Sequence, residues 1–213
     1  MIDEKRARGN LTLDDIRAAL NKPLPGLAAQ LKLAPEYRVE SLRATPPLDA
    51  RAAGVLILLY PHAGEWHFPL MKRTEDGLAH SGQISLPGGS QEAGESLRET
   101  ALREACEEIG VACAGGVEVI GQLSTIYIPP SNFLVTPTVG FAVERPDFRC
   151  DPREVAELIE VPLSALFDRD VVKREAWSLR GTTVEVPFYQ IGSYKVWGAT
   201  AMILSEFSMV LAE

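Results

Sequence analysis

The chain is short of cysteine and of long apolar runs, and both shortages exclude classes of protein. It has 3 cysteines in 213 residues, with no CxxC spacing, so we expect no disulfide framework and a cytoplasmic location. The longest apolar run, 52–60, is about half of what a membrane-spanning helix needs, so we expect no membrane partner. The first residues, MIDEKRARGN, have no apolar core and no small-residue cleavage site, which predicts no signal peptide.

Positive charge is also scarce. The chain has 21 Lys and Arg against 29 Asp and Glu, a formal net charge of −8. Proteins that bind nucleic acid through its phosphates are usually basic, so we expect no nucleic-acid partner. A small phosphorylated substrate is compatible with this charge, because a bound metal ion can supply positive charge locally. Hydrophobic residues make up 46%, which excludes a largely disordered chain.

The pattern along the chain predicts one main domain, 51–213, after an N-terminal region, 1–50. No internal repeat is visible, and the length suits one domain with a substantial core. In the N-terminal region we expect a short helix over 12–20, capped by Thr12 with Asp15 three residues later. Prolines punctuate residues 22–50, which predicts an extended lead-in rather than regular structure.

Within the main domain, β-prone apolar segments alternate with two helical segments. Several strands interrupted by two substantial helices predict an α+β or mixed α/β fold. The expected helices are 95–109, which Gly110 ends, and 199–211. The expected strands are 53–60, 67–73, 117–128, 133–144, 184–191 and 193–197.

Three glutamates lie close together on the first of these helices. Glu104, Glu107 and Glu108 are spaced i, i+3, i+4, which places them on one face. Each like-charged pair costs about 0.2–0.5 kcal/mol even in water, and a divalent cation between them would remove that cost. Oxygen-only ligation suits Mg²⁺ or Mn²⁺. Most glutamate clusters are solvated helix faces, so this cluster alone does not decide between the two readings.

The residues around the cluster form a long motif, Gx5Ex7REUxEExGU, in which U is a bulky apolar residue. If each residue type occurs at about 7%, a given window matches the fixed positions by chance roughly once in 10⁸. Ala105 is small for the first U position, and Val111 suits the second. The seven fixed positions are all matched, by Gly89, Glu95, Arg103, Glu104, Glu107, Glu108 and Gly110.

This motif resembles the Nudix box. The resemblance implies a Nudix fold, an α/β/α sandwich with a mixed β-sheet, and an Mg²⁺- or Mn²⁺-dependent diphosphatase. It implies that Glu104 and Glu108 are metal ligands, that Glu107 is a third ligand or supports them, and that the Gly89 carbonyl also coordinates. With Arg103, the three glutamates make up the implied catalytic set.

Two further roles follow from the box. Glu95 lies near the helix start and is expected to pair with Arg103, which then orients the carboxylates. The general base stays open, because Nudix enzymes take it either from the box, here Glu104, or from a later loop. Glu154 and Glu157 are the loop candidates, and the alternative is that both are ordinary surface acids.

The segment before the box, 70–89, resembles a signature of coenzyme A diphosphatases, LLTxR(S/A)x3Rx3GQxxFPGG. The match includes Arg73, Gln83 and Gly88, which together with Ser85 we expect to contact substrate. Thr74, Leu78 and Leu86 depart from the signature, and Leu78 removes a cation that an anionic ligand could use. Two later segments, 151–168 and 197–201, also resemble that subfamily.

The resemblance therefore implies hydrolysis of coenzyme A or an acyl derivative to 3′,5′-ADP and phosphopantetheine or its acyl form. One alternative is another nucleoside diphosphate derivative, such as ADP-ribose or a dinucleotide. A second is a nucleotide-binding module without activity, which the intact carboxylates disfavour. The substrate is thus expected to be a small nucleotide. The N-terminal 50 residues could form a flap over it or the contact of a homodimer.

Overall fold

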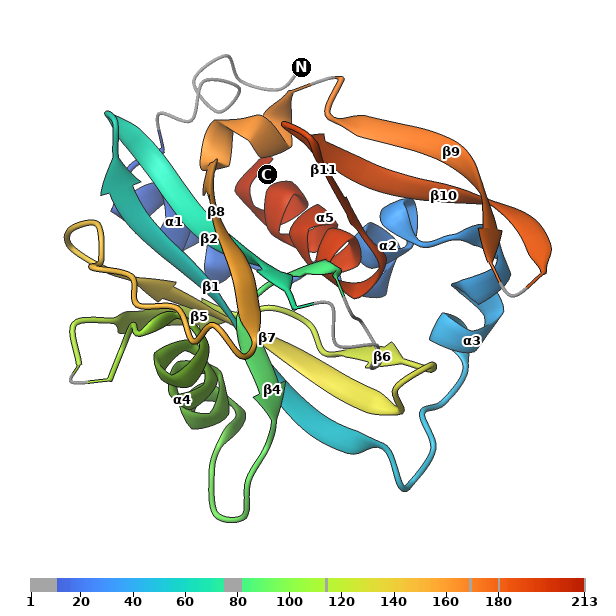
Figure 1. Cartoon of the computed structure of the whole chain (residues 1–213), viewed down its shortest axis with the longest axis horizontal. Coiled ribbons are helices and arrows are strands. Elements are labelled where there is room, and N and C mark those ends of the chain that lie inside the picture. The colour runs from blue at the N-terminus through green and yellow to red at the C-terminus, as the bar shows by residue number, and fades with distance from the viewer. Residues whose placement is uncertain (1–10, 75–81, 114, 169, 180, 213) are drawn as a thin grey trace.

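The structure, a computed structural model, describes residues 11–74, 82–113, 115–168, 170–179 and 181–212. A mixed β-sheet forms the centre, with helices on both faces (Figure 1), which confirms the predicted fold class. The strand order is β3-β2-β1-β7-β5, with β4 beside β1, β6 beside β7 and β8 beside β2, and only β1 and β7 pair in parallel within this described sheet. The elements are β1 (Arg51–His62), β2 (Glu65–Arg73), β3 (Ile84–Ser85), β4 (Gly88–Ser90), α4 (Leu97–Ile109), β5 (Glu118–Gln122), β6 (Ile126–Ile128), β7 (Phe133–Phe141), β8 (Val155–Pro162) and α5 (Gly198–Ala212).

Strand β1 lies at the centre of the sheet and serves two hydrophobic cores. Leu56, Leu58 and Tyr60 pack in a cluster with the apolar side of α4. Ile57 and Leu59 belong to the larger cluster, which contains the side chains of α5. Successive residues of a strand point to opposite faces, so the uninterrupted apolar run of β1 reflects burial on both sides.

Helix α4 begins and ends at sequence signals. Ser96 caps it and forms a capping box with Glu99, so the helix starts two residues after the start of the predicted 95–109. Gly110 ends it with φ 75°, as predicted. A Cβ on Gly54 of β1 would lie 2.4 Å from a backbone carbonyl oxygen in the first turn of α4. The absence of that Cβ therefore lets α4 pack directly onto the sheet.

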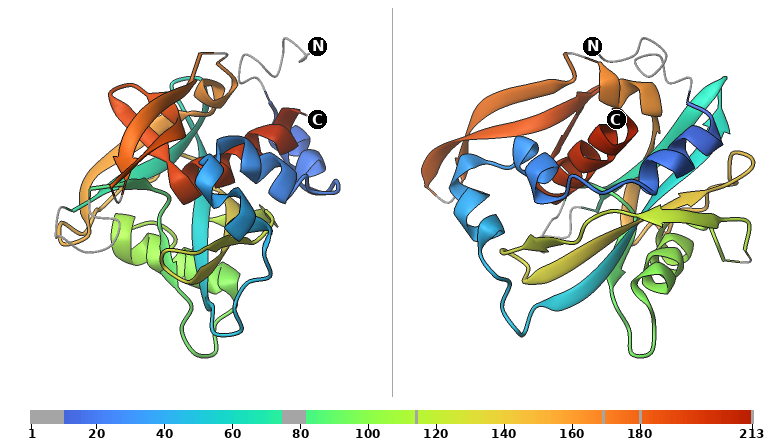
Figure 2. Two further views of the ribbon diagram at one scale, coloured as in Figure 1. Left: turned by 90° about the vertical axis from the view of Figure 1, so that its right-hand side faces the viewer. Right: turned by 180° about the vertical axis from the view of Figure 1, so that it is seen from behind.

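The prediction for the first helix is confirmed and the prediction for the segment after it is wrong. Helix α1 (Leu13–Leu20) has the capping box of Thr12 and Asp15. Residues 22–50, expected to be extended, instead contain short helices, because a proline such as Pro35 can stand at the start of a helix. Figure 2 shows this N-terminal segment packed along α5. The short helices are α2 (Leu27–Gln30), η2 (Leu31–Leu33), η3 (Glu36–Arg38) and α3 (Val39–Arg43).

The predicted strand 117–128 is two strands, β5 and β6, which both pair with β7. The register on β7 shifts within β5, and the chain leaves the sheet at Ser124. The Ser124 N–H donates to the carboxylate of Glu206 on α5 (3.2 Å). A buried acceptor on a distant helix therefore interrupts a segment that looks continuous in the sequence.

Strands β3, β4, β8 and β9 were not predicted. β8 carries two acids, Glu157 and Glu160, among apolar residues and pairs only with β2 among the described strands, so one of its edges is open. A second, three-stranded sheet follows, in the order β11-β10-β9. The predicted hairpin around Gly192 is confirmed in this sheet, and a short 3-10 helix precedes it at η4 (Leu163–Phe167). The strands are β9 (Val172–Leu179), β10 (Thr182–Ile191) and β11 (Tyr194–Trp197).

The cysteine count predicted no disulfide framework, and the described residues contain a single disulfide that the sequence did not indicate. Cys106 and Cys113 are joined, with their Cα atoms 4.9 Å apart. The chain reverses after α4 at Gly110, which returns Cys113 to the side of the helix. Cys150 is free. In the described part of the chain, none of the helices has the length and apolar character needed to cross a membrane.

Candidate active site

The loop before α4 is held against the sheet by its glycines. Gly88 has φ 152°, and a Cβ there would lie 2.4 Å from the Gly54 carbonyl oxygen. A Cβ on Gly89 would lie 2.4 Å from Oε1 of Glu104. The Gly88 N–H donates to Oε2 of Glu108 (2.7 Å). Because neither glycine has a side chain, β4 lies directly beside the carboxylates of α4.

The three box glutamates differ in burial. The exposed fraction of the side chain is 2% for Glu108, 15% for Glu104 and 57% for Glu107. Among the described residues, no three His, Cys, Asp or Glu side chains are grouped so that they could hold one metal ion. The three glutamates therefore differ in their surroundings. Glu104 and Glu108 are buried beside β4, and Glu107 lies at the solvent edge.

Arg103 connects the box carboxylates. Its Nε and Nη2 donate to both carboxylate oxygens of Glu95 (2.6 and 3.2 Å), so the predicted ion pair is present. Its Nη1 donates to Glu104 (2.9 Å) and Glu107 (3.1 Å). The hydrogen bond from Arg103 lowers the pKa of Glu95 to about 2. Arg103 therefore fixes the direction in which Glu104 points.

Arg73 lies between the box and the segment that contains Glu154. Its Nη1 donates to Glu108 (3.2 Å), and its Nη2 lies 3.8 Å from Oε2 of Glu154. Glu157, the other candidate base, instead accepts a hydrogen bond from the Tyr194 hydroxyl. β8 pairs with β2 beside Arg73, with a register shift at that point. The structure thus places Glu154, and not Glu157, next to the box.

Burial dominates the electrostatics of the two inner carboxylates. It raises the pKa of Glu108 to about 8, against the opposing effects of the Gly88 N–H and Arg73. Burial also raises the pKa of Glu104, against the opposing effect of Arg103. The charge of Glu154 raises both pKa values further. These acids therefore hold negative charge only at a cost, which a cation beside them would relieve.

The donor set fits a divalent metal ion. Glu104 and Glu108 offer carboxylate oxygens, the Gly89 backbone offers a carbonyl, and the missing Cβ of Gly89 leaves room beside Glu104. All these donors are oxygens, which Mg²⁺ and Mn²⁺ prefer. The chain can therefore supply the ligands that the box predicts.

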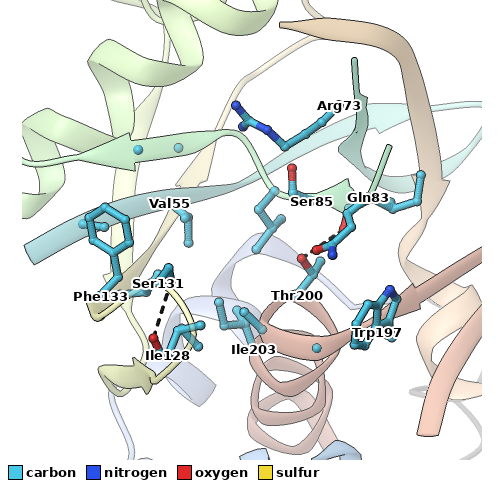
Figure 3. Close-up of a pocket in the computed structure, with 18 of the residues that line it drawn as sticks. Val55, Arg73, Gln83, Ser85, Ile128, Ser131, Phe133, Trp197, Thr200 and Ile203 are labelled. Carbon is cyan, nitrogen blue, oxygen red and sulfur yellow. Dashed lines mark hydrogen bonds between the residues drawn. The ribbon is translucent and has the colours of Figure 1, made fainter. Parts of the chain in front are cut away.

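A cavity of about 320 Å³ opens beside the box, a volume in the range of ligand sites. The predicted substrate residues Arg73, Gln83, Ser85 and Gly88 all line it, as does Gly89 (Figure 3). The buried Ser85 hydroxyl has no hydrogen-bond partner among the described residues, so it has capacity for a ligand. Leu78 lies outside the described residues. The apolar lining residues include Val55, Ile128, Phe133, Val135 and Ile203.

Sequence reasoning missed some of this lining. Trp197 borders the cavity, where it packs edge-on against Trp177. Arg38 also lines the cavity, from η3 in the N-terminal segment. No motif surrounds Arg38, and its role depends on how a distant segment folds back. Only a method that places the N-terminal segment against the domain could have found it.

Comparison with known proteins places this site in a family. The NUDIX domain model matches residues 50–180. The chain is 32% identical to an uncharacterized Nudix hydrolase, NudL, of Pectobacterium atrosepticum, over 86% of this chain and 91% of that one. It is 34% identical to NudL of Photorhabdus laumondii, over 65% and 74%. A solved Nudix hydrolase, RenU of M. smegmatis, is 24% identical over 56% and 74%, with a TM-score of 0.47.

Proposed function

The chain belongs to the Nudix family, whose members hydrolyse diphosphate bonds in nucleoside diphosphate derivatives, and we propose that its substrate is coenzyme A or an acyl-coenzyme A. The products would be 3′,5′-ADP and phosphopantetheine or its acyl form. One observation carries this proposal. Arg73, Gln83 and Gly88, from the segment that resembles the coenzyme A diphosphatase signature, line one cavity that adjoins the box carboxylates.

Nudix hydrolases generally use divalent metal ions. When bound, Mg²⁺ or Mn²⁺ neutralises charge on the diphosphate and acidifies the attacking water. We assign its ligands to Glu104, Glu108 and the Gly89 carbonyl. Glu107, at the solvent edge and joined to Arg103, is the third carboxylate available.

The chain's own residues position these groups. Arg103 orients Glu104, while the Gly88 N–H and Arg73 hold the two oxygens of Glu108. Glu154 is half exposed and lies near the guanidinium of Arg73, which lines the cavity. We propose Glu154 as the general base. Glu157, which the Tyr194 hydroxyl holds, is proposed as structural.

Product analysis tests the substrate. The protein is incubated with coenzyme A, ADP-ribose or NADH in the presence of Mn²⁺, and the products are identified by mass spectrometry. We expect 3′,5′-ADP from coenzyme A. Turnover of ADP-ribose or NADH with no 3′,5′-ADP from coenzyme A would assign the enzyme to the alternative substrates. Cytoplasmic location, a homodimer and the boundary at residue 50 stay predictions.

A further inference from the structure

The cavity beside the box contains a second arginine whose pairing differs from that of Arg73. Arg73 faces two carboxylates, Glu108 and Glu154. Arg38 also lines the cavity, and its Nε donates to the Tyr37 hydroxyl (3.0 Å). Within the described residues, Arg38 forms no ion pair with an acidic side chain. In a chain with net charge −8, this leaves a guanidinium at the cavity whose charge is not neutralised.

The N-terminal segment holds Arg38 at this position. Pro35 precedes η3, and Leu33 and Ala34 before it are buried in the main core. The Ser41 hydroxyl donates to the Arg38 carbonyl oxygen (2.8 Å), which fixes the turn after it. Helix η3 contacts β10 and helix α3 contacts β6. Arg38 is thus anchored by its own segment and does not depend on an acidic partner for its position.

The surfaces near Arg38 and Arg73 suit different parts of one ligand. Arg73 adjoins Glu108, which the proposed function assigns as a ligand of the metal ion that neutralises the diphosphate. Much of the cavity wall is apolar, and it includes Phe133, Ile203 and the ring of Trp197. Such a wall accepts a flat base or a chain of methylene groups. A cation apart from the diphosphate site then suits an additional anionic group on the same molecule.

We propose that Arg38 binds a phosphate monoester that the substrate carries apart from its diphosphate, and thereby selects nucleotides phosphorylated on the 3′ hydroxyl. A guanidinium can donate two parallel hydrogen bonds to a phosphate, which favours it over the hydroxyl of an unphosphorylated analogue. This inference rests on the proposed function, since coenzyme A carries such a 3′-phosphate. It assigns the N-terminal segment a part in specificity.

Paired substrates test this inference. The ratio of kcat/KM for coenzyme A to that for 3′-dephospho-coenzyme A is measured with the wild type, Arg38→Gln, Arg38→Lys and Arg43→Gln. A charged hydrogen-bonding pair corresponds to about a tenfold change or more, so we expect Arg38→Gln to lower this ratio about tenfold. Arg38→Lys should lower it less, because it keeps the charge and loses the bidentate geometry. Arg43, exposed on α3 five residues later, is the matched control and should keep the wild-type ratio.

A binding measurement separates this inference from the proposed function. Calorimetry compares adenosine 3′,5′-bisphosphate with 5′-AMP on the same four proteins, whose folding is checked by thermal melting. We expect the wild type to bind the bisphosphate more tightly than 5′-AMP. In Arg38→Gln, the ratio of the two affinities should be about tenfold smaller. If coenzyme A is hydrolysed but Arg38→Gln and Arg38→Lys leave both ratios at the wild-type value, the inference fails and the function stands. If coenzyme A is not hydrolysed but the Arg38-dependent preference is found, the function fails and the anion site stands.

Discussion

Two glutamates are buried in this protein on opposite faces of the central sheet, and they differ in what surrounds them. Glu108 on α4 is 2% exposed, accepts from the Gly88 N–H and Arg73, and lies beside the cavity. Glu206 on α5 is 0% exposed and accepts from the Gln30 amide (2.8 Å) and the Ser124 N–H. Of the described residues, no Lys, Arg or His forms an ion pair with Glu206.

The difference lies in where the partners come from. Glu206 connects α5 to α2 and to the turn between β5 and β6, so its hydrogen bonds join three segments that are distant in sequence. The partners of Glu108 come from the loop and strand that line the cavity, and burial still raises its pKa to about 8. Glu206 holds the fold together, whereas Glu108 is held under electrostatic strain where a cation can bind.

The strongest test of this comparison removes the charge of Glu108. Glu108→Gln keeps the size of the side chain and an oxygen for the Gly88 N–H, but it removes the charge assigned to metal binding. We expect kcat/KM for the substrate to fall by about 10²–10³-fold or more with the fold intact. The measurements are steady-state kinetics with Mn²⁺ and circular dichroism. Wild-type kinetics in a folded Glu108→Gln protein would contradict the assignment of Glu108 as a ligand.

A pair of variants, at Glu154 and Glu157, tests which of the two acids works together with Glu108. Glu154 shares Arg73 with Glu108, while Glu157 lies three residues later, on β8, and is held by Tyr194. We expect Glu154→Gln to lower kcat about 10²-fold, the lower range for general bases. Glu157→Gln, the matched control, should change kcat by less than about fivefold. Equal losses in both variants, measured by the same assay, would remove the distinction between the two acids.

For Glu206, the other buried carboxylate, we expect a loss of stability and no loss of activity. Glu206→Ala removes the acceptor of one Gln30 amide N–H and of the Ser124 N–H, at a cost of about 2–3 kcal/mol. For a chain of this size, that corresponds to a fall in Tm of roughly 5–10 °C. At temperatures where the variant is folded, its kcat/KM should equal that of the wild type. A loss of activity without a loss of stability would show that the two carboxylates do not divide as we infer.

The sequence predicted these two regions unequally. Glu104, Glu107 and Glu108 lie within one helix, so their spacing and the motif around them were visible, as were the capping of α1 and the end of α4. Glu206 is a single acid in an apolar helix, and its partner Gln30 is 176 residues away in sequence. Nothing local to either residue indicates that they meet.

The same reasoning explains the other misses. Predictions succeeded where a local signal decides the structure, as with Gly110 or the turn at Gly192. They failed where packing on a distant element decides it, as in the short helices of 22–50 and the break between β5 and β6. Arg38 belongs to this second class. Its place at the cavity follows from the N-terminal segment as a whole.

The smallest expected effect is the pH dependence of stability without metal. In EDTA, the folded protein keeps a proton on Glu108 up to its pKa of about 8, whereas the unfolded chain releases it near the ordinary glutamate value. The free energy of unfolding contributed by this group therefore falls as pH rises from about 4.5 to 8. Glu108→Gln cannot ionise, so we expect its stability relative to the wild type to rise by about 1–2 kcal/mol between pH 5 and pH 8, because rotation toward water reduces the full linkage value.

Thermal melts at pH 5, 6.5 and 8 measure this difference, with Glu206→Gln as a control at a buried acid on the other face. Added Mn²⁺ at pH 8 should then stabilise the wild type more than Glu108→Gln, because an ion that binds the ionised carboxylate replaces the proton it has lost. If the wild type instead gains stability relative to Glu108→Gln from pH 5 to pH 8, the change has the opposite sign, and burial does not destabilise the charged form of Glu108. The sign of this change in the free energy of unfolding therefore decides whether burial of the Glu108 charge destabilises the folded protein.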